Sequence, residues 1–543
     1  MNRSTFKSGV SREQSSLLPP RIEDYVAANN PVRAIDAFGD AADLDRMGFR
    51  QPGSEGGRGQ PPYDPRDLLK LFLYGYTNRI RSSRNLEREA MRNLELIWLL
   101  RGLQPGYRTI AKFRSENWAA LRALCRDFVV VMRELGLVGG ERVAIDGAFF
   151  HGNASKASIK TRKGIAKRLA AIEADIEAYG AAVKANDEVD DRAEVARPPS
   201  ERGGGRPGED VAQKMAALLE KRDKLTADLA RLEASGETQL SRTDPDARLL
   251  SKRGQAIAGY NVQIAVDDKE KLVVAHEVVN DGNDSGQLYP MAKAAKEELG
   301  VETLTVLADT GYDSSNGLKD CEESGIVAYV PLMQRSGLMK AQGRLSHEEF
   351  IYDAQADAYC CPAGLLLTPT KVRKIRASGR SDIRYASRKA DCDACSLRSL
   401  CVSAKTPTRT ILRWEHEAVL ERHRARMKDA DAPMRRRAEL AEHPFGTLKC
   451  RAGYRHFLVR GFDKVRGECS LMVLCYNLSR VLSIVGIDRL IAYLAERARK
   501  LLFLCLREAL AGAIGRALLF RERIGSQIRT EHAPSRLARG YAT

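Results

Sequence analysis

The spacing of apolar residues changes several times along the chain. Between residues 64 and 136, apolar positions recur every three or four residues, and turn residues separate short segments. This spacing predicts several short helices. Asp64 followed by Pro65 is typical of a helix start, and Ser82 or Ser83 would cap the next helix. We therefore expect a helical domain over residues 64–138.

Helical spacing returns further along the chain, over two longer stretches. Apolar residues step by four and three from Ile165 to Val183 and again from Val211 to Leu232. The Pro- and Gly-rich residues 197–208 separate the two stretches. This pattern predicts an antiparallel helical hairpin inserted over residues 160–235, with its apolar stripe packed upon itself.

Short apolar runs of the kind that form strands lie on both sides of this hairpin. They are Val143–Phe150, Tyr260–Val266, Leu272–Val279, Leu304–Ala308 and Ile326–Pro331. Helical patterns over residues 287–299 and 314–324 separate the last three runs. A strand, a β-hairpin and then alternating helices and strands predict an α/β fold with a mixed sheet covered by helices.

Two acids stand at the ends of apolar runs. Asp146 precedes a glycine, and Asp309 precedes Thr310 and Gly311. A carboxylate in a buried strand needs a partner, a capping role or a metal ion, because burying an unpaired charge costs several kcal/mol. Side chains at strand ends of an open α/β sheet converge on a ligand crevice. Each acid alone is more typical of a turn, but the pair together suggests a cation site.

The charge of the chain narrows the class of partner. Its 88 Lys and Arg residues against 71 Asp and Glu residues give a net charge of +17. Such an excess favours a polyanion, nucleic acid before an anionic membrane, although a basic soluble enzyme would look the same. We find no run of 18 apolar residues and no apolar segment near the N-terminus, so we expect neither a membrane span nor a secretory signal.

Basic residues concentrate on the expected short helices. We select Arg84, Arg108, Lys112 and Arg114 as candidate DNA contacts. Short helices studded with arginine are similar to helix-turn-helix units, while the alternative is a solvated basic face on an ordinary helical domain.

Five of the eleven cysteines lie between Cys360 and Cys401. An odd total is unlike a secreted disulfide framework, so the cluster suggests metal binding or burial. Cys361, Cys392, Cys395 and Cys401 have the spacing C-x30-C-x2-C-x5-C, with Cys360 as an alternative first ligand. The C-x2-C half is typical of zinc sites, but four reduced thiols on a core-poor loop would fit this irregular spacing too.

Glu442 lies in a basic helical stretch, seven residues before Lys449. Two helical turns separate them, so they would share a face if the helix persists. Pro444 suggests that the helix bends or begins there. By its position in the sequence alone, Glu442 is a surface acid among basic residues.

Several motifs together resemble a known family. They are VAIDGAFF, GYNVQIAVD, VLADTGYDS, AEHPFGTLK and RGFDKVRGECSLMVLCYNLSRVL. In this order they look like the blocks of bacterial insertion-sequence transposases of the DDE type. The most similar group has a Glu-x6-Lys signature and a cysteine-rich insertion before the glutamate. The segments YDPRDLLKLFLYGYTNRIRSSRNLE and GYRTIAKFRSEN resemble its helical DNA-binding region.

This resemblance implies an RNase H-like catalytic core with three carboxylates, Asp146, Asp309 and Glu442, that hold two Mg²⁺ or Mn²⁺ ions. It implies that Arg437 and Lys449 contact DNA phosphates or orient the DNA end. Where the family often has a tyrosine shortly before this arginine, the chain has Met434, which puts that supporting aromatic role in doubt. The resemblance also implies that the four cysteines hold a structural Zn²⁺ ion.

The reaction expected from the resemblance is phosphodiester cleavage at the element ends followed by joining to target DNA. The partners would be duplex DNA, as terminal inverted repeats and target, and further copies of the chain, in the bacterial cytoplasm at the nucleoid. The alternatives are a non-catalytic or decayed DNA-binding protein and a metal-dependent nuclease without strand transfer.

The domain boundaries follow from these expectations. We predict a basic arm (1–63), a helical DNA-binding domain (64–138), an RNase H-like core (139–159, 236–335 and 430–490), an inserted helical hairpin (160–235), a cysteine-rich insertion (336–429) and a basic tail (491–543). The tail is either a read-through extension or a DNA-binding appendage.

Overall fold

The structure is a computed structural model that describes residues 21–50, 61–195, 208–252, 254–333, 337, 341–375, 380–403, 406–501 and 503. Contacts divide the chain into a first unit, residues 1–120 and 478–543, and a second unit, residues 121–477. The start of the expected arm, nearly all of the hairpin loop and most of the expected tail, including Cys505, lie outside the described residues.

The first unit is helical. Its main helices are α1 (Pro31–Ala41), α2 (Pro65–Thr77), α3 (Ser83–Arg92), α4 (Leu94–Leu99) and α5 (Tyr107–Glu116), preceded by the short η1 (Ile22–Tyr25). The Asp64 side chain caps α2 by accepting a hydrogen bond from the Arg66 backbone N–H at 2.8 Å, as the sequence predicts. Ser82 occupies the cap position of α3, but its side chain makes no capping bond.

Helix α1 extends the folded region into the segment that we expected to be an arm. Its contact with α2 is fixed by Lys70, whose side chain is fully buried. The Lys70 Nζ lies 2.6 Å from a carboxylate oxygen of Asp36 and 2.6 Å from one of Asp40. Gly39 makes room, because a Cβ there would lie 2.5 Å from Lys70 Cγ.

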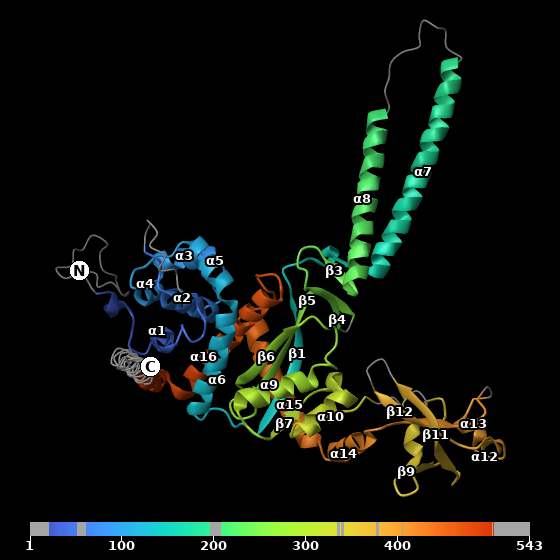
Figure 1. Cartoon of the computed structure of the whole chain (residues 1–543). Helices are drawn as coiled ribbons and strands as arrows, with labels where there is room; N and C mark the ends of the chain where they lie inside the picture. Colours follow the sequence, from blue (N-terminus) through green and yellow to red (C-terminus); the bar gives the residue numbers. More distant parts are fainter. Residues whose placement is uncertain are drawn as a thin grey trace, which may run out of the picture. The chain divides into compact units, whose positions relative to one another are not determined.

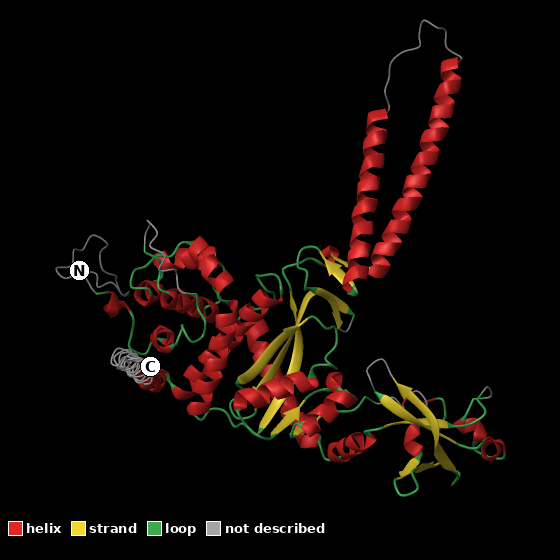
Figure 2. Ribbon diagram, in the orientation of Figure 1, coloured by secondary structure: helices red, strands yellow, loops and turns green. Residues whose placement is uncertain are grey.

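The second unit is built on a six-stranded mixed sheet (Figures 1 and 2). The strands are β1 (Arg142–His151), β4 (Arg248–Lys252), β5 (Gln255–Asp267), β6 (Val273–Val279), β7 (Leu304–Leu307) and β8 (Ile326–Tyr329). Their order is β4-β5-β1-β7-β8, and β6 also pairs with β5. Strand β1 is antiparallel to β5 and parallel to β7, so the predicted mixed sheet is confirmed.

Strand β5 continues further toward its N-terminus than the sequence predicts, and Gly259 explains this. A Cβ at Gly259 would lie 1.9 Å from the Phe150 carbonyl oxygen of β1. Only glycine therefore lets the two backbones run this close, and β5 continues through it to pair with β4.

Helices of the second unit surround this sheet. They are α6 (Trp118–Glu134, which starts in the first unit), α9 (Leu288–Leu299), α10 (Ser315–Glu323), α14 (Glu417–Met427), α15 (Asp431–Gly446) and α16 (Phe462–Val485, which ends in the first unit). By length and composition α16 alone among the described helices could span a membrane, but 67% of its apolar window is buried within the protein, as in a core helix.

The inserted hairpin consists of α7 (Arg162–Val195) and α8 (Gly208–Ser235), which run side by side (Figure 1). Ile165, Leu225 and Leu232 form its buried core, so the apolar stripe packs upon itself near the base of the hairpin. The side chains of Val183 and Val211, at the far ends of the predicted stripe, lie outside the described residues. At its base, β2 (Ile159–Thr161) pairs with β3 (Gln239–Ser241).

The cysteine-rich insertion is a second sheet rather than the core-poor loop that the sequence suggested. Its strands are β9 (Ile351–Asp353), β10 (Ala358–Cys360), β11 (Leu366–Ile375), β12 (Ser381–Ala386) and β13 (Thr410–Trp414), with the short helices α12 (Lys389–Asp393) and α13 (Arg398–Cys401). Its core is formed by Phe350, Tyr359, Leu367, Tyr385 and Ile411. These residues are far apart in the sequence and show no periodicity, which is why the pattern missed them.

Candidate active site

The two acids lie at the same level of the sheet, but only Asp309 follows the end of its strand. The expected position of Asp146 at a strand end is wrong, because β1 continues beyond it to His151 by pairing with β5. Strands β1 and β7 are parallel, and Ala144 pairs with Leu307. Asp146 and Asp309 each follow two residues later, so both side chains extend from the same face beyond this last pair. Asp309 begins the turn η4 (Thr310–Tyr312), and its Oδ1 accepts a hydrogen bond from the Gly311 backbone N–H at 2.8 Å.

Arg437 of α15 joins these two carboxylates. Its Nη2 donates to Asp146 Oδ1 at 2.9 Å and lies 3.4 Å from Asp309 Oδ2. The side chains of Arg437 and Asp146 are 19% and 20% exposed, so water only partly screens their attraction. A cationic group therefore already occupies the space between the two acids.

The position of α15 over the sheet follows from its apolar residues. Leu440, one helical turn beyond Arg437, is buried against Ala144 of β1 and Leu307 of β7. Met434, one turn before Arg437, packs against the same cluster. The residue that departs from the family pattern thus supports the helix by apolar contact.

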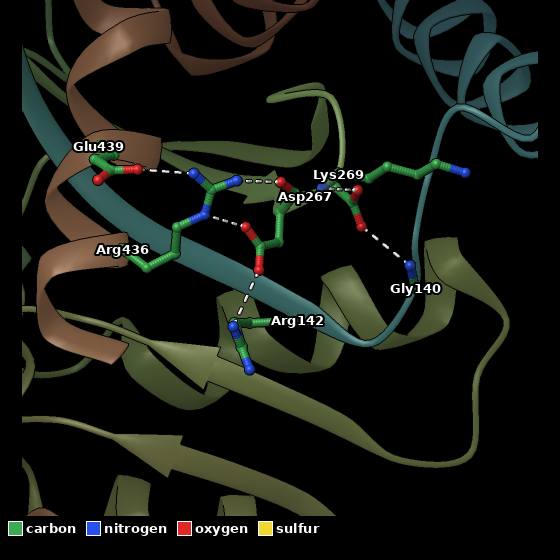
Figure 3. A network of polar contacts seen from close by, with 7 residues as sticks. Gly140, Arg142, Asp267, Lys269, Arg436 and Glu439 are labelled. Atoms are coloured by element: carbon green, nitrogen blue, oxygen red, sulfur yellow. Dashed lines mark hydrogen bonds and ion pairs between the residues drawn. The ribbon is translucent and has the colours of Figure 1, made fainter. Parts of the chain in front are cut away.

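A polar network at the start of β1 also fixes α15 (Figure 3). Asp267, fully buried at the end of β5, accepts hydrogen bonds from the backbone N–H groups of Gly139, Gly140 and Lys269 at 2.9–3.1 Å. Its neighbour Asp268 forms ion pairs with Arg142 of β1 and with Arg436 of α15. Arg436 is thereby fixed next to the end of strand β5, one residue before Arg437.

Glu442, the third predicted carboxylate, lies on the same helix and is exposed. It follows Arg437 by five residues, which turns it roughly 140° around the helix axis at 100° per residue. Among the described residues, no group of three or more His, Cys, Asp and Glu side chains is arranged to hold a metal ion. The structure thus joins Asp146 and Asp309 through Arg437 but does not gather all three acids into one group.

The Glu-x6-Lys segment does not continue as a regular α-helix. Helix α15 runs through Pro444 to Gly446, so it does not begin at the proline, and a π-helical turn follows over Thr447–Arg451. Lys449 lies in this turn, where its Nζ donates to the Phe149 carbonyl at 2.8 Å and lies 4.6 Å from the Phe150 ring centroid. His443 contacts the Tyr476 hydroxyl of α16 through Nδ1 at 3.0 Å.

A second polar network, which the sequence reading missed, supports the site from behind. Gln263 of β5 is fully buried and pairs in register with Gly147, which places it on the face opposite to Asp146. Its Nε2 donates to Asp284 Oδ1 at 2.7 Å, and its Oε1 accepts a hydrogen bond from the Tyr312 hydroxyl. Asn261 Nδ2 donates to the same Asp284 oxygen at 2.8 Å.

The electrostatics of Tyr312 connect this network to the site. Burial, followed by the negative charges of Asp284, Asp146 and Asp309, raises the pKa of Tyr312 well above its usual value. The phenol therefore remains a neutral hydrogen-bond donor at physiological pH. One sequence signal could have revealed the network: two amides, Asn261 and Gln263, alternate with apolar residues in an otherwise apolar strand.

The four predicted zinc ligands lie outside the strands of the second sheet, Cys361 directly after β10 and Cys392, Cys395 and Cys401 in and between the short helices α12 and α13. Burial, and then the nearby Cys392, Cys361 and Cys395, raise the pKa of the Cys401 thiol, although Arg409 opposes the shift. Cys392 Sγ lies 2.9 Å from the Ser387 hydroxyl, and Cys361 Sγ accepts a hydrogen bond from the Leu365 N–H at 3.3 Å. Each thiol is partly exposed. They too fall outside any metal-holding group among the described residues. Cys469 and Cys475 are buried on α16.

The predicted DNA contacts of the first unit lie on α3 and α5. Arg84 and Arg108 are exposed, and their guanidinium carbons lie 5.3 Å and 5.8 Å from the Tyr107 ring centroid. Lys112 is exposed one turn beyond Arg108. Arg114 is partly buried over the Phe72 ring and donates to the Arg81 carbonyl at 3.3 Å. Three of the four basic side chains are therefore available at the surface of this unit.

Two segments of the chain resemble known protein families. Residues 360–482 match the family model described as Transposase DDE domain, and residues 20–116 match the one described as Transposase domain (DUF772). A solved structure, the "piggyBac transposase synaptic complex with hairpin DNA", aligns at 9% identity with a TM-score of 0.28, over 87% of this chain and 82% of that chain. No curated protein matches. The two family matches support an insertion-sequence-type DDE transposase.

Proposed function

We propose that this protein cleaves the ends of an insertion sequence and joins them to target DNA. The observation that carries the proposal is the meeting of Asp146, in the middle of β1, with Asp309, just after the end of the parallel strand β7, and a cationic side chain between them. The mixed sheet, with β1 at its centre, supports the further proposal of an RNase H-like core.

The donor chemistry of the site fits a divalent cation. Carboxylate oxygens are the ligands that Mg²⁺ and Mn²⁺ prefer, and the Arg437 guanidinium shows that positive charge is stable between Asp146 and Asp309. We propose that these two acids hold the metal and that Glu442 completes the ligand set. Bound divalent cations would stabilise the attacking and the leaving oxygen of a phosphodiester displacement.

The chain's own residues would prepare the site for that chemistry. Arg437 balances the two negative charges before metal and DNA bind, and its guanidinium can then turn to a phosphate, for which its planar donors are suited. Lys449 lies against β1 beyond Asp146, where its positive charge would attract the phosphates of a DNA strand. The surface arginines of α3 and α5 would supply end recognition.

The experiment uses the full-length protein, a duplex carrying the inverted repeats that flank the gene, and a target plasmid in Mg²⁺ buffer. We expect end cleavage and joined products, both abolished separately by Asp146→Asn, Asp309→Asn and Glu442→Gln. Cleavage without joined products would favour a nuclease, and specific binding without cleavage would favour a decayed copy. Near wild-type cutting by any one variant would remove that residue from the assignment.

A further inference from the structure

The network behind the sheet contains an acid that the proposed chemistry does not use. Asp284 lies in the loop between β6 and α9, and one of its oxygens accepts hydrogen bonds from both Asn261 and Gln263. Both amides are fully buried, and the Asn261 Oδ1 has no hydrogen-bond partner. Losing the Asp284 carboxylate would leave Gln263 Nε2 without its acceptor and would leave Asn261 Nδ2 only a long 3.4 Å contact with the Asp281 carbonyl, so both buried amides favour Asp284 at this position.

Gly147 lets Asp284 approach β1, and Gly311 lies beside both Asp284 and Asp309. A Cβ at Gly147, the residue after Asp146, would lie 2.3 Å from Gln263 Nε2 and 2.7 Å from Asp284 Oδ1. A Cβ at Gly311 would lie 3.6 Å from Asp284 Oδ2 and 2.9 Å from Asp309 Oδ1. Asp284 is thus packed between the backbone next to one candidate ligand and the turn that holds the other.

The turn η4 is held from two sides. The Gly311 N–H fixes one oxygen of Asp309, which leaves the other oxygen facing Arg437. Tyr312, the next residue, is anchored by its hydroxyl to Gln263, and Gln263 is anchored in turn to Asp284. The direction of the Asp309 carboxylate therefore depends on a chain of contacts that ends at Asp284.

From this geometry we propose that Asp284 is a positioning residue of the active site, which fixes the turn that orients Asp309 toward the metal. The inference rests on the proposed function for the identity of the metal ligands. Asp284 itself does not touch the metal in this proposal, and its effect passes through Gln263, Tyr312 and Gly311.

The test measures Mn²⁺ binding to the full-length protein by isothermal titration calorimetry, with DNA cleavage as a second readout. Asp284→Ala should weaken Mn²⁺ binding about 10-fold, as loss of an outer support of a metal ligand typically does. Asp284→Asn, which retains an acceptor oxygen of the same shape, should bind within about 3-fold of wild type. Asp281→Ala, an exposed acid of the same loop, is the matched control and should not change binding.

A second variant distinguishes a positioning role of Asp284 from simple misfolding of Asp284→Ala. Tyr312→Phe removes only the hydroxyl that bonds Gln263, and it should weaken Mn²⁺ binding in the same direction as Asp284→Ala while the protein stays folded. Wild-type affinity in both Asp284→Ala and Tyr312→Phe would overturn the proposal. Loss of binding in Asp284→Asn as severe as in Asp146→Asn would overturn it too, because Asp284 would then be a ligand.

The two proposals fail in different ways. If wild-type protein binds Mn²⁺ and responds to these variants but never cuts DNA, the proposed function fails and the role of Asp284 stands. If it cuts DNA and the variants bind Mn²⁺ unchanged, only the role of Asp284 fails. A wild-type protein that binds no Mn²⁺ would overturn the positioning role directly.

Discussion

Replacing Arg437 by glutamine tests whether the two acids form a cation site. At an effective dielectric constant of about 20, a unit charge at 2.9 Å and 3.4 Å from two carboxylate oxygens gains roughly 6 and 5 kcal/mol of gross Coulomb energy. Desolvation and the partial exposure of Asp309 cancel most of this gain. We expect Arg437→Gln to lower the free energy of unfolding by a net ~1–3 kcal/mol without divalent ions, between the values for exposed and buried ion pairs.

The second measurement is the gain in stability that Mn²⁺ gives to wild-type protein and to Arg437→Gln. In wild-type protein Mn²⁺ must compete with the guanidinium, whereas in Arg437→Gln it meets two uncompensated carboxylates. Ligand at 100 times its dissociation constant stabilises the native state by about 2.7 kcal/mol. The variant should therefore gain more stability from saturating Mn²⁺ than wild type does, by about the 1–3 kcal/mol lost with the arginine. Thermal unfolding with and without MnCl₂ measures both quantities.

Arg436→Gln is the matched control. Arg436 precedes Arg437 on α15 and also forms an ion pair across the sheet, but with Asp268, away from the two candidate ligands. Its loss should destabilise the protein equally with and without Mn²⁺. An equal gain from Mn²⁺ in wild type and Arg437→Gln would refute the reasoning, since Asp146 and Asp309 would then not be the place where the metal binds.

Three further predictions concern the structure around the site. Gly259→Ala should lower the free energy of unfolding by about 3 kcal/mol, because its Cβ would meet the Phe150 carbonyl. Gly282→Ala, whose Cβ would meet open space, is the control and should be neutral in urea unfolding. Equal unfolding midpoints of the two variants would contradict the close strand contact. Burial lowers the pKa of His276 to about 4, so the unfolded chain binds a proton that the folded protein excludes, and stability should fall by ~1–3 kcal/mol as pH drops from about 6.5 to about 4. His276→Gln should flatten that loss in unfolding curves, and an unchanged pH profile would show that another group is responsible. If the four cysteines hold zinc, purified protein should contain about one zinc ion per chain. Cys392→Ser with Cys395→Ser should lose it while the exposed Cys450→Ser keeps it; folded wild-type protein without zinc would contradict a structural role.

The sequence predicted those parts of the fold that depend on local spacing. The five apolar runs became strands and the two stepped stretches became a hairpin, because burial on one face leaves a period in the sequence. Asp146 and Asp309 were found for the same reason, since a charge inside or directly after such a run is conspicuous. Their equal level in the sheet could not be predicted, because it depends on the register between β1 and β7.

Contacts between segments that are distant in the sequence could not be predicted from it. The support of Asp309 combines a strand residue, Gln263, with the loop acid Asp284 and the turn residue Tyr312. Gln263 is unusual in its apolar strand, but nothing in the sequence indicates that its partners are Asp284 and Tyr312. The π-helical turn at Lys449 was not predicted for another reason. Local helix propensity cannot distinguish one widened turn from a regular helix. Glu442 became a candidate only through the family resemblance, and its role stays a prediction.

The cysteine-rich sheet is inserted into the chain between β8 and α14, and this has a consequence for synthesis on the ribosome. Asp146 and Arg437 are separated by 291 positions, and His423 of α14 must return over 93 positions to contact the Val330 carbonyl. Such distant pairs form late, since most of the polypeptide must be made before they can meet. A nascent or prematurely terminated chain would thus carry both strand acids without the helix that completes the site. The order of translation would keep unfinished chains from cutting DNA.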